Sequence, residues 1–466
     1  MPVQIKDDGS FEIIYGGPYK GIDVQMPQNL VDPAEATAIN NFIVRNAAIT
    51  SRPQFIPWTV ALGGSNVLTG QGTFLSPLGY YHTFAFDSAG NLYNLTAATN
   101  TLTNIAALPT LQSTNPVNWR VFNSILYWVN GSQSMGAWDG QFAPGGIIKY
   151  GVGAGGAGYA VGDTGTVTTG GANATYQVTA VVAGAVSAFI ITNSGSSYSV
   201  SNGQATAITT GAGNGAFTVN VFQIGIGPKQ QVATVTTTMT GDTPLGARYI
   251  GMLDQHAILA NTIGNASDGP FTIRWSAVGL PTVFDPTVNI NAGFNIFNDF
   301  ADAISGMLFL GRVAYIFHRT GITEMAPTGV GTAPFDFNHI WNSQDGSGNI
   351  FPNTIAQYGQ VGVFVSTENI YSVQNYQFQP IGGNARDGIM SDLNNALTGI
   401  GSSVPIGTIV PGYENDFIYL AYQIIIPQGI GGPTIIWQYS FENNTWERLT
   451  LTGAVVTGIP TFCVTK

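Results

Sequence analysis

A recurring strand–turn–strand phrase constrains this chain more than any other feature. An apolar, often aromatic run stops at a short polar turn and then resumes, as in residues 81–95 and 121–129. Runs of β-branched and aromatic residues bounded by Asn, Asp or Gly predict β-hairpins. Another such turn is predicted where Ala137-Trp138 meets Asp139-Gly140. The phrase recurs near residues 81, 121, 252, 309, 361 and 413.

The spacing is regular except for one gap, which an inserted block explains. The three later gaps are 57, 52 and 52 residues, whereas the gap from 121 to 252 is 131 residues. Residues 151–222 differ in composition, because this Gly-rich block of 72 residues has one charged residue, Asp163. It also contains a duplication, in which residues 156–161 parallel 195–200 and residues 168–178 parallel 209–219. Alternating apolar positions favour a small β domain over a disordered Gly linker, with a core predicted to include Tyr159, Tyr176, Tyr198 and Phe217.

Units of roughly 40 to 60 residues that each hold two hairpins are typical of propeller blades. We therefore predict an all-β fold, a β-propeller of about six blades with an inserted small β domain; a pair of β-sandwiches or barrels is the alternative. Helices are expected only at residues 32–41 and 392–397. The chain is predicted to begin with an N-terminal arm and the first propeller strands at residues 1–60. The first part of the propeller follows at 61–150, the insert at 151–222 and the second part of the propeller at 223–466.

Composition excludes several classes of protein. The chain has 466 residues, 14 of them basic and 25 acidic, for a net charge of −11. Without a run of Lys or Arg, specific nucleic-acid readout is not expected, because phosphate neutralisation needs clustered cations. No window approaches the roughly 18 consecutive apolar residues of a spanning helix, and the first residues lack the pattern of a signal peptide. A single cysteine, Cys463, excludes a disulfide within the chain and a cysteine-based zinc site.

The histidines show no metal-binding pattern. The four are His82, His256, His318 and His339, and no pair has the i, i+4 spacing of a helical metal site. His82 and His256 lie inside strand phrases and are expected to be structural, while His318 is expected to belong to a turn with residues 319–321.

Carboxylate motifs are few. Asp299 and Asp302 could face a cleft, but capping of a short turn is the preferred interpretation. Residues 87–91 and 345–349 resemble fragments of calcium loops without the closing Glu, so hairpin turns are predicted there. No catalytic, cofactor-binding or metal-binding residue is predicted, no cofactor is expected, and the protein is not expected to be an enzyme.

Several non-catalytic motifs carry a family resemblance. The N-terminal region contains Tyr15-Gly-Gly-Pro, Asn40-Asn-Phe and Thr50-Ser-Arg-Pro, and the middle contains Arg274-Trp-Ser-Ala-Val-Gly-Leu-Pro and Thr323-Glu-Met. Their order and spacing over residues 15–60 and 245–450 resemble the tail nozzle or tail hub proteins of podophage-type bacteriophages. These are also called packaged-DNA stabilisation or tail accessory proteins. The block at 151–222 departs from the compact pattern of that family.

The resemblance implies a structural virion protein of the phage tail, assembled in the host cytoplasm. It implies a homo-oligomeric ring, expected to be a hexamer, at the distal end of the head-to-tail connector below the portal and adaptor. Such a ring retains packaged DNA, lets double-stranded DNA pass without sequence preference on ejection, and docks tail fibres or spikes. An acidic chain repeated six times would repel DNA from the lumen, but the sequence does not identify the residues that line it.

Two other functions stay open. A peripheral propeller on a fibre or baseplate would bind host-surface glycan through exposed aromatic residues, in the insert or around Trp138. A polysaccharide depolymerase would require paired carboxylates in one cavity.

Overall fold

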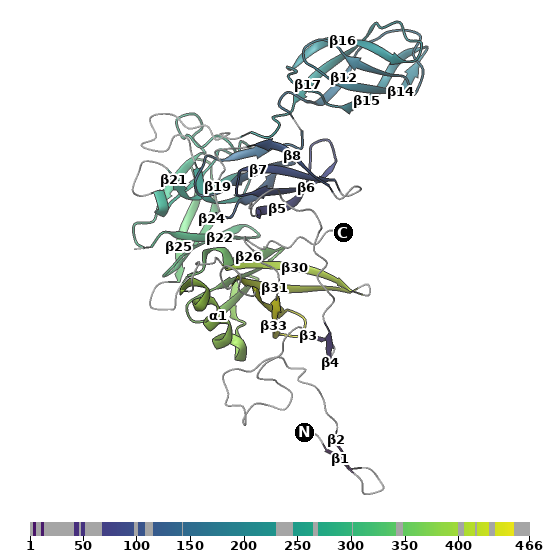
Figure 1. Cartoon of the computed structure of the whole chain (residues 1–466). Helices are drawn as coiled ribbons and strands as arrows, with labels where there is room; N and C mark the ends of the chain where they lie inside the picture. Colours follow the sequence, from purple (N-terminus) through teal and green to yellow (C-terminus); the bar gives the residue numbers. More distant parts are fainter. Residues whose placement is uncertain are drawn as a thin grey trace.

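A computed structural model gives the fold of the chain. The residues it describes are 3–5, 11–13, 42–45, 48–51, 68–96, 101–107, 115–141, 143–229, 246–263, 269–300, 302–341, 348–398, 405–414, 417–427 and 434–451. Within them, six antiparallel sheets and an inserted sheet account for most of the structure (Figure 1). The protein is an all-β propeller of six blades with an inserted small β domain, as the sequence predicted.

Each blade is a meander whose strands are hydrogen-bonded in chain order. Blades 1 and 2 consist of β5 (Leu68–Leu75), β6 (Tyr81–Asp87), β7 (Asn91–Thr96) and β8 (Thr101–Ala107), then β9 (Asn118–Phe122), β10 (Ile125–Val129) and β11 (Gly136–Trp138). Blades 3 and 4 consist of β18 (Gly246–Leu253), β19 (His256–Ile263), β20 (Thr272–Trp275) and β21 (Gly293–Ile296), then β22 (Ile304–Leu310), β23 (Val313–His318), β24 (Ile322–Val330) and β25 (Ala333–Trp341). Blades 5 and 6 consist of β26 (Ala356–Tyr358), β27 (Val361–Val365), β28 (Ile370–Gln374) and β29 (Gln377–Pro380), then β30 (Ile406–Glu414), β31 (Phe417–Pro427), β32 (Thr434–Ser440) and β33 (Thr445–Leu451). The six recurring phrases fall in six different blades.

Tight turns set the register of several hairpins. The pairs Asn123-Ser124 and Asp254-Gln255 both have two successive positive φ angles, 49° and 61° in the first and 46° and 64° in the second. Two-residue turns of this kind match the right-handed twist of the flanking strands. The prediction of a hairpin at Asp139-Gly140 was wrong, because the chain leaves blade 2 there and enters the insert.

The chain rejoins blade 2 after the insert. Ala137 and Lys229 exchange two backbone hydrogen bonds of 2.8 and 2.9 Å, so the returning segment lies beside β11. The segment at Lys229 therefore occupies the position that the fourth strand holds in the other blades.

Apolar clusters fill the spaces between successive blades. Separate clusters join blade 1 to 2, 2 to 3, 3 to 4, 4 to 5, and 5 to 6. Blade faces approach so closely that some strand positions must be glycine. A Cβ at Gly251 would lie 1.9 Å from the ring of Phe309, and one at Gly407 would lie 2.3 Å from the carbonyl oxygen of Thr354. Burial of apolar faces between neighbours stabilises sheets that are too small to fold alone.

Side-chain amides add polar ties near the centre of the propeller. The amide of Asn118, on β9, donates to the carbonyl oxygen of Arg248, on β18, at 2.9 Å. Gln357, on β26, exchanges hydrogen bonds with both backbone groups of Phe309, on β22. These bonds satisfy backbone groups that have no strand partner on their inner side.

The insert is a six-stranded sheet in the order β12-β17-β16-β13-β14-β15, curled so that its edge strands β12 and β15 lie against each other. Its strands are β12 (Ile147–Gly155), β13 (Thr164–Val167), β14 (Thr175–Val182), β15 (Ala185–Asn193), β16 (Ser201–Thr210) and β17 (Phe217–Ile224). Tyr159, Tyr176, Tyr198 and Phe217 are all buried in its core, as predicted. The domain stands apart from the blades at the top of Figure 1.

A buried carboxylate holds the base of the insert. Asp139 accepts hydrogen bonds from the backbone N–H groups of Gln141, Ile226 and Gly227, at 3.1, 2.6 and 3.2 Å. One side chain thereby joins the chain entering the insert to the chain leaving it. Burial raises the pKa of Asp139, and these hydrogen bonds oppose the shift.

One α-helix is described, α1 (Arg386–Thr398), and it contains the predicted segment 392–397. It packs on blade 6 through Ile389, Leu393 and Ala396, which recur at helical spacing on one face. The helix predicted at 32–41 lies outside the described residues. Short 3-10 turns occur at Gly269–Phe271, Pro352–Thr354 and Gly383–Ala385, and small hairpins at Val3–Ile5 with Phe11–Ile13 and at Phe42–Arg45 with Ala48–Ser51. None of the helices described is long and apolar enough to cross a membrane.

A candidate binding cavity at the propeller hub

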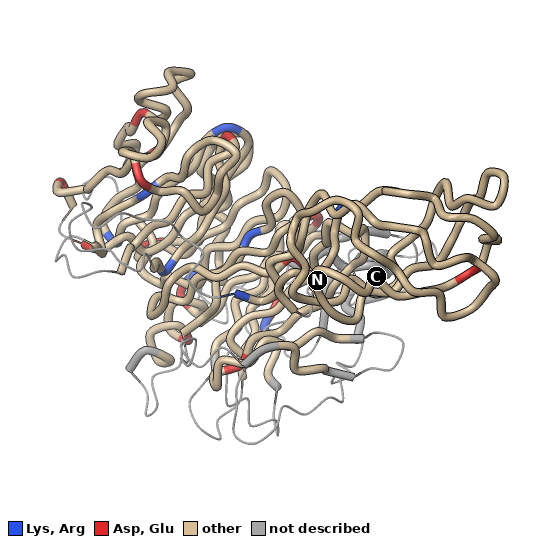
Figure 2. The backbone as a smooth tube through the Cα atoms, turned by 90° about the horizontal axis from the view of Figure 1, so that it is seen from above, with Lys and Arg blue, Asp and Glu red and all other residues tan. Residues whose placement is uncertain are grey.

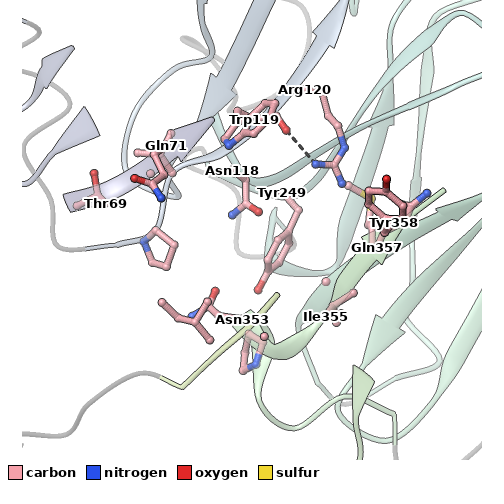
Figure 3. A pocket seen from close by; sticks show the side chains of 18 of the residues that line it. Thr69, Gln71, Asn118, Trp119, Arg120, Tyr249, Asn353, Ile355, Gln357 and Tyr358 are labelled. Atoms are coloured by element: carbon pink, nitrogen blue, oxygen red, sulfur yellow. Dashed lines mark hydrogen bonds between the residues drawn. The ribbon is translucent and has the colours of Figure 1, made fainter. Parts of the chain in front are cut away.

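The first strands of all six blades surround one cavity of about 490 Å³ (Figure 3). Because the first and the last blade both contribute, the blades converge on a common axis. The lining residues that contribute side chains on these strands include Thr69 and Gln71 (β5), Asn118 and Arg120 (β9), Tyr249 (β18), Met307 (β22), Gln357 and Tyr358 (β26), and Ile406 (β30). We call this space the hub cavity.

Arg120 is the one formally charged side chain among the described residues that line the hub cavity. One of its terminal nitrogens donates to the carbonyl oxygen of Trp119 at 2.9 Å, the bond drawn in Figure 3. Burial lowers the pKa of the Arg120 guanidinium, because the charged form has lost much of its hydration. The guanidinium keeps its positive charge at neutral pH, since arginine side chains are not deprotonated in proteins.

The remaining polar groups of the hub cavity are neutral. Burial raises the pKa of Tyr249 to about 12, against the opposing effect of the neighbouring Arg248, so its phenol is protonated and can donate a hydrogen bond. The amides of Asn118 and Gln357 already bind backbone groups. Gln71 and Asn353 add two more amides to the lining. The cavity thus combines one cation with several neutral donors and acceptors.

Two of the histidines are structural, as predicted. His256 is buried, and its Nδ1 lies within hydrogen-bond distance of the carbonyl oxygen of Ser276. His82 packs between Phe74 and Trp138 at centroid distances of 5.4 and 5.2 Å. Burial lowers the pKa of His82, which is a shift toward the neutral ring.

The other two histidines form a cluster that the sequence analysis missed. The backbone N–H of His318 closes the expected turn on Gly321 at 2.9 Å, but its ring is fully buried and stacks on Phe300 at 3.9 Å. His339 stands beside it, with Nδ1 2.8 Å from the hydroxyl of Thr323 and Nε2 3.2 Å from the carboxylate of Asp299. The paired strands β24 and β25 place Thr323 opposite His339, a register that the sequence alone did not reveal.

The two carboxylates considered for a cleft have separate contacts. Asp299 pairs with His339, while the carbonyl oxygen of Asp302 lies 3.4 Å from Nδ1 of His318. Within the described residues, no group of three or more His, Cys, Asp or Glu could hold a metal ion.

The suspected calcium-loop fragment at 87–91 is a hairpin turn, as predicted. Asp87 accepts hydrogen bonds from the backbone N–H groups of Ala89 and Asn91 at 3.0 and 2.8 Å, and from the hydroxyl of Tyr93 at 2.9 Å. The second fragment, 345–349, lies mostly outside the described residues, as does Cys463.

Comparisons with known proteins assign no family to the chain. No protein-family model and no curated protein matches the chain. Among solved structures, U3-55K has 7% identity and a TM-score of 0.32, covering 85% of each chain. A protein assigned as a 6-phosphogluconolactonase from Bacteroides fragilis has 9% identity and a TM-score of 0.32, covering 82% of this chain and 80% of its own. AztD from Citrobacter koseri, in its apo form, has 11% identity and a TM-score of 0.28, covering 84% and 83%.

Proposed function

We propose that this protein is a structural component of a phage tail, a ring-forming nozzle or hub protein that retains packaged DNA and lets it pass on ejection. The motifs at residues 15–60 and 245–450 support the proposal, and so does the six-bladed propeller. The ring would sit below the portal and adaptor and would dock tail fibres or spikes. The observation that carries the proposal is an outer surface suited to contacts between proteins.

Exposed apolar side chains gather on the edge of blades 3 and 4. Val288, Ile290 and Phe294 precede or belong to β21, and all three are exposed. A Cβ at Gly331 would lie 3.3 Å from the amide oxygen of Asn291, so exposed Val330 belongs to the same region. We call Val288, Ile290, Phe294 and Val330 the edge patch. Groups of exposed apolar side chains can mark interaction sites in soluble proteins.

A low surface charge also favours extensive contacts between copies of the chain. Figure 2 shows charged residues as short, scattered segments along the backbone. Interface cores are depleted of charged residues relative to the rest of a protein surface. Six copies of a chain with a net charge of −11 can approach one another more easily through surfaces that carry little charge.

Trp138 itself is not available for glycan binding. Trp138 is fully buried, and its indole N–H donates to the carbonyl oxygen of Gln141 at 2.8 Å. The large aromatic residues of the insert are mostly core residues, although Phe222 is exposed. Trp138 itself therefore offers no stacking surface for sugar, although Tyr80 and Tyr81, which precede its ring neighbour His82, are exposed.

The oligomeric state tests the proposal. We expect size-exclusion chromatography with light scattering at micromolar concentration to find a species of six times 49.0 kDa, and negative-stain images to show rings with an axial opening. Ile290→Asp should shift the distribution toward monomers, because it puts a charge into the edge patch. Val182→Asp, on the exposed surface of the insert, is the matched control. A wild-type protein that is monomeric both in solution and in purified particles would contradict the proposal.

A further inference from the structure

We propose that the hub cavity binds a small oxyanion, a carboxylate or phosphate group on a polar body small enough for a cavity of about 490 Å³, through the guanidinium of Arg120. This inference does not depend on the tail-ring proposal, because it concerns the interior of a single propeller. It rests on the geometry of Arg120, on the charge balance of the cavity and on the cavity's size.

Most of the hydrogen-bond donors of Arg120 are available to a ligand. A guanidinium has five N–H donors in a planar fork that matches carboxylate and phosphate oxygens. In the described structure, its hydrogen-bond acceptor is the carbonyl oxygen of Trp119. The side chain is only partly buried, since it borders the space of the hub cavity.

The charge of Arg120 has no counter-ion among the described residues of the cavity wall. None of the described lining residues is Asp or Glu. Removing a cation from water is costly unless an anion or several hydrogen bonds offset the lost hydration. The lowered pKa of Arg120 reports this loss of hydration. An anion from solution would supply the missing charge and form charge-assisted hydrogen bonds.

The other lining groups favour a polar ligand of limited size. Gln71, Asn353 and the Tyr249 hydroxyl provide neutral donors from three other parts of the wall, and Figure 3 shows them around the same space as Arg120. Trp119 and Tyr358 add aromatic surface. A volume of about 490 Å³ falls at the lower end of the range for small-molecule sites, about 300 to 1,000 Å³.

An isothermal titration with three probes tests the proposal: inorganic phosphate, D-glucuronate and, as an uncharged control, D-glucose. We expect at least one anion to bind saturably with one site per chain, while glucose does not. Tighter binding of phosphate or of glucuronate would show whether the cavity prefers a phosphate group or a carboxylate. Failure of both anions to bind at low salt would overturn the inference.

Three variants connect the binding to Arg120. Arg120→Gln should raise the Kd at least tenfold, whereas Arg120→Lys should have a smaller effect because it keeps the charge and loses the fork. Arg312→Gln, at the exposed turn after β22, should bind as wild type does. Equal affinity in wild type and Arg120→Gln would show that the anion binds elsewhere and would refute the assignment.

A further variant covers the case in which Arg120→Gln fails to fold. Asn353→Asp adds a carboxylate to the same cavity and leaves Arg120 in place, so it should abolish anion binding by charge repulsion and by competition for the guanidinium. Folding of each variant can be followed by circular dichroism. Unchanged anion affinity in a folded Asn353→Asp protein would contradict the proposal.

Discussion

The buried ring of His318 should make the stability of the propeller depend on pH, and His318→Phe should remove that dependence. The ring is fully buried, stacks on Phe300 at an interplanar angle of 10°, and meets the edge of Phe297 at 5.1 Å. Its Nε2 is buried without a hydrogen-bond partner. A phenyl ring of similar shape would keep both aromatic contacts and lose only the 3.4 Å contact with the carbonyl oxygen of Asp302.

The size of the effect follows from the pKa. Burial lowers the pKa of His318 from 6.5 to about 4, the carbonyl of Asp302 opposes the shift, and nearby His339 adds to it. Because the folded protein binds this proton less readily than the unfolded chain, stability is complete above about pH 6.5 and falls as the pH decreases toward 4. The loss attributable to His318 is about 2 kcal/mol at pH 5, and approaches about 3.4 kcal/mol below pH 4, at 1.36 kcal/mol per pKa unit.

Urea unfolding at several pH values between 7.5 and 4.5, followed by tryptophan fluorescence, measures this difference. The free energy of unfolding of wild type should fall more steeply than that of His318→Phe, by about 2 kcal/mol at pH 5 relative to pH 7.5. His339→Gln is the comparison variant, because it removes only the smaller contribution of His339 to the His318 shift and leaves the larger contribution of burial, so most of the pH dependence should remain. Parallel pH profiles for wild type and His318→Phe would refute the reasoning.

Two further predictions concern packing. Gly407→Ala should cost about 1 to 3 kcal/mol of folding free energy, because its Cβ would meet the backbone oxygen of Thr354, in the 3-10 turn that precedes the neighbouring blade 5. Gly331→Ala, with no contact nearer than 3.3 Å, is the control, and equal unfolding midpoints for the two variants would contradict the blade contact. Phe217→Ala should destabilise the insert by about 3 to 5 kcal/mol and open it to limited proteolysis before the blades are cut, since Phe217 is fully buried. Phe222→Ala, which truncates a half-exposed ring, should leave the proteolysis rate unchanged, and equal sensitivity of the two variants would show that Phe217 is not a core residue.

The parts of the fold that sequence could predict are those with local physical causes. Polar turns such as Asn123-Ser124 separate one strand from the next, so each hairpin can be predicted from a stretch of about ten residues. The insert was visible because its composition changes abruptly and its duplicated Tyr and Phe positions mark a separate core. The pattern of hairpins then predicted six blades without any knowledge of how they pack.

Long-range contacts explain what sequence could not predict. Arg120 stands in an ordinary strand, and its place at the hub depends on residues as distant as Ile406. Asp139-Gly140 has the sequence of a hairpin turn, yet its carboxylate binds Ile226, 87 positions away. The same local turn sequence therefore serves either a hairpin or a chain crossing, and only the packing decides between them.

The positions of the buried aspartates change how the net charge bears on passage of DNA. Asp87, Asp139, Asp163 and Asp285 are all buried, and each accepts at least one hydrogen bond from a backbone N–H in a turn or junction. Carboxylates used in this way stabilise turns, and they contribute less to the field outside the protein than exposed charges do. The net charge of −11 therefore overstates the negative charge exposed at the surface. The insert exposes almost none of it, because its one acidic side chain is the buried Asp163. If a ring of these chains repels DNA from its lumen, the repulsion must come from exposed carboxylates of the propeller or the N-terminal arm, and neutralising Asp163 should leave DNA passage unchanged.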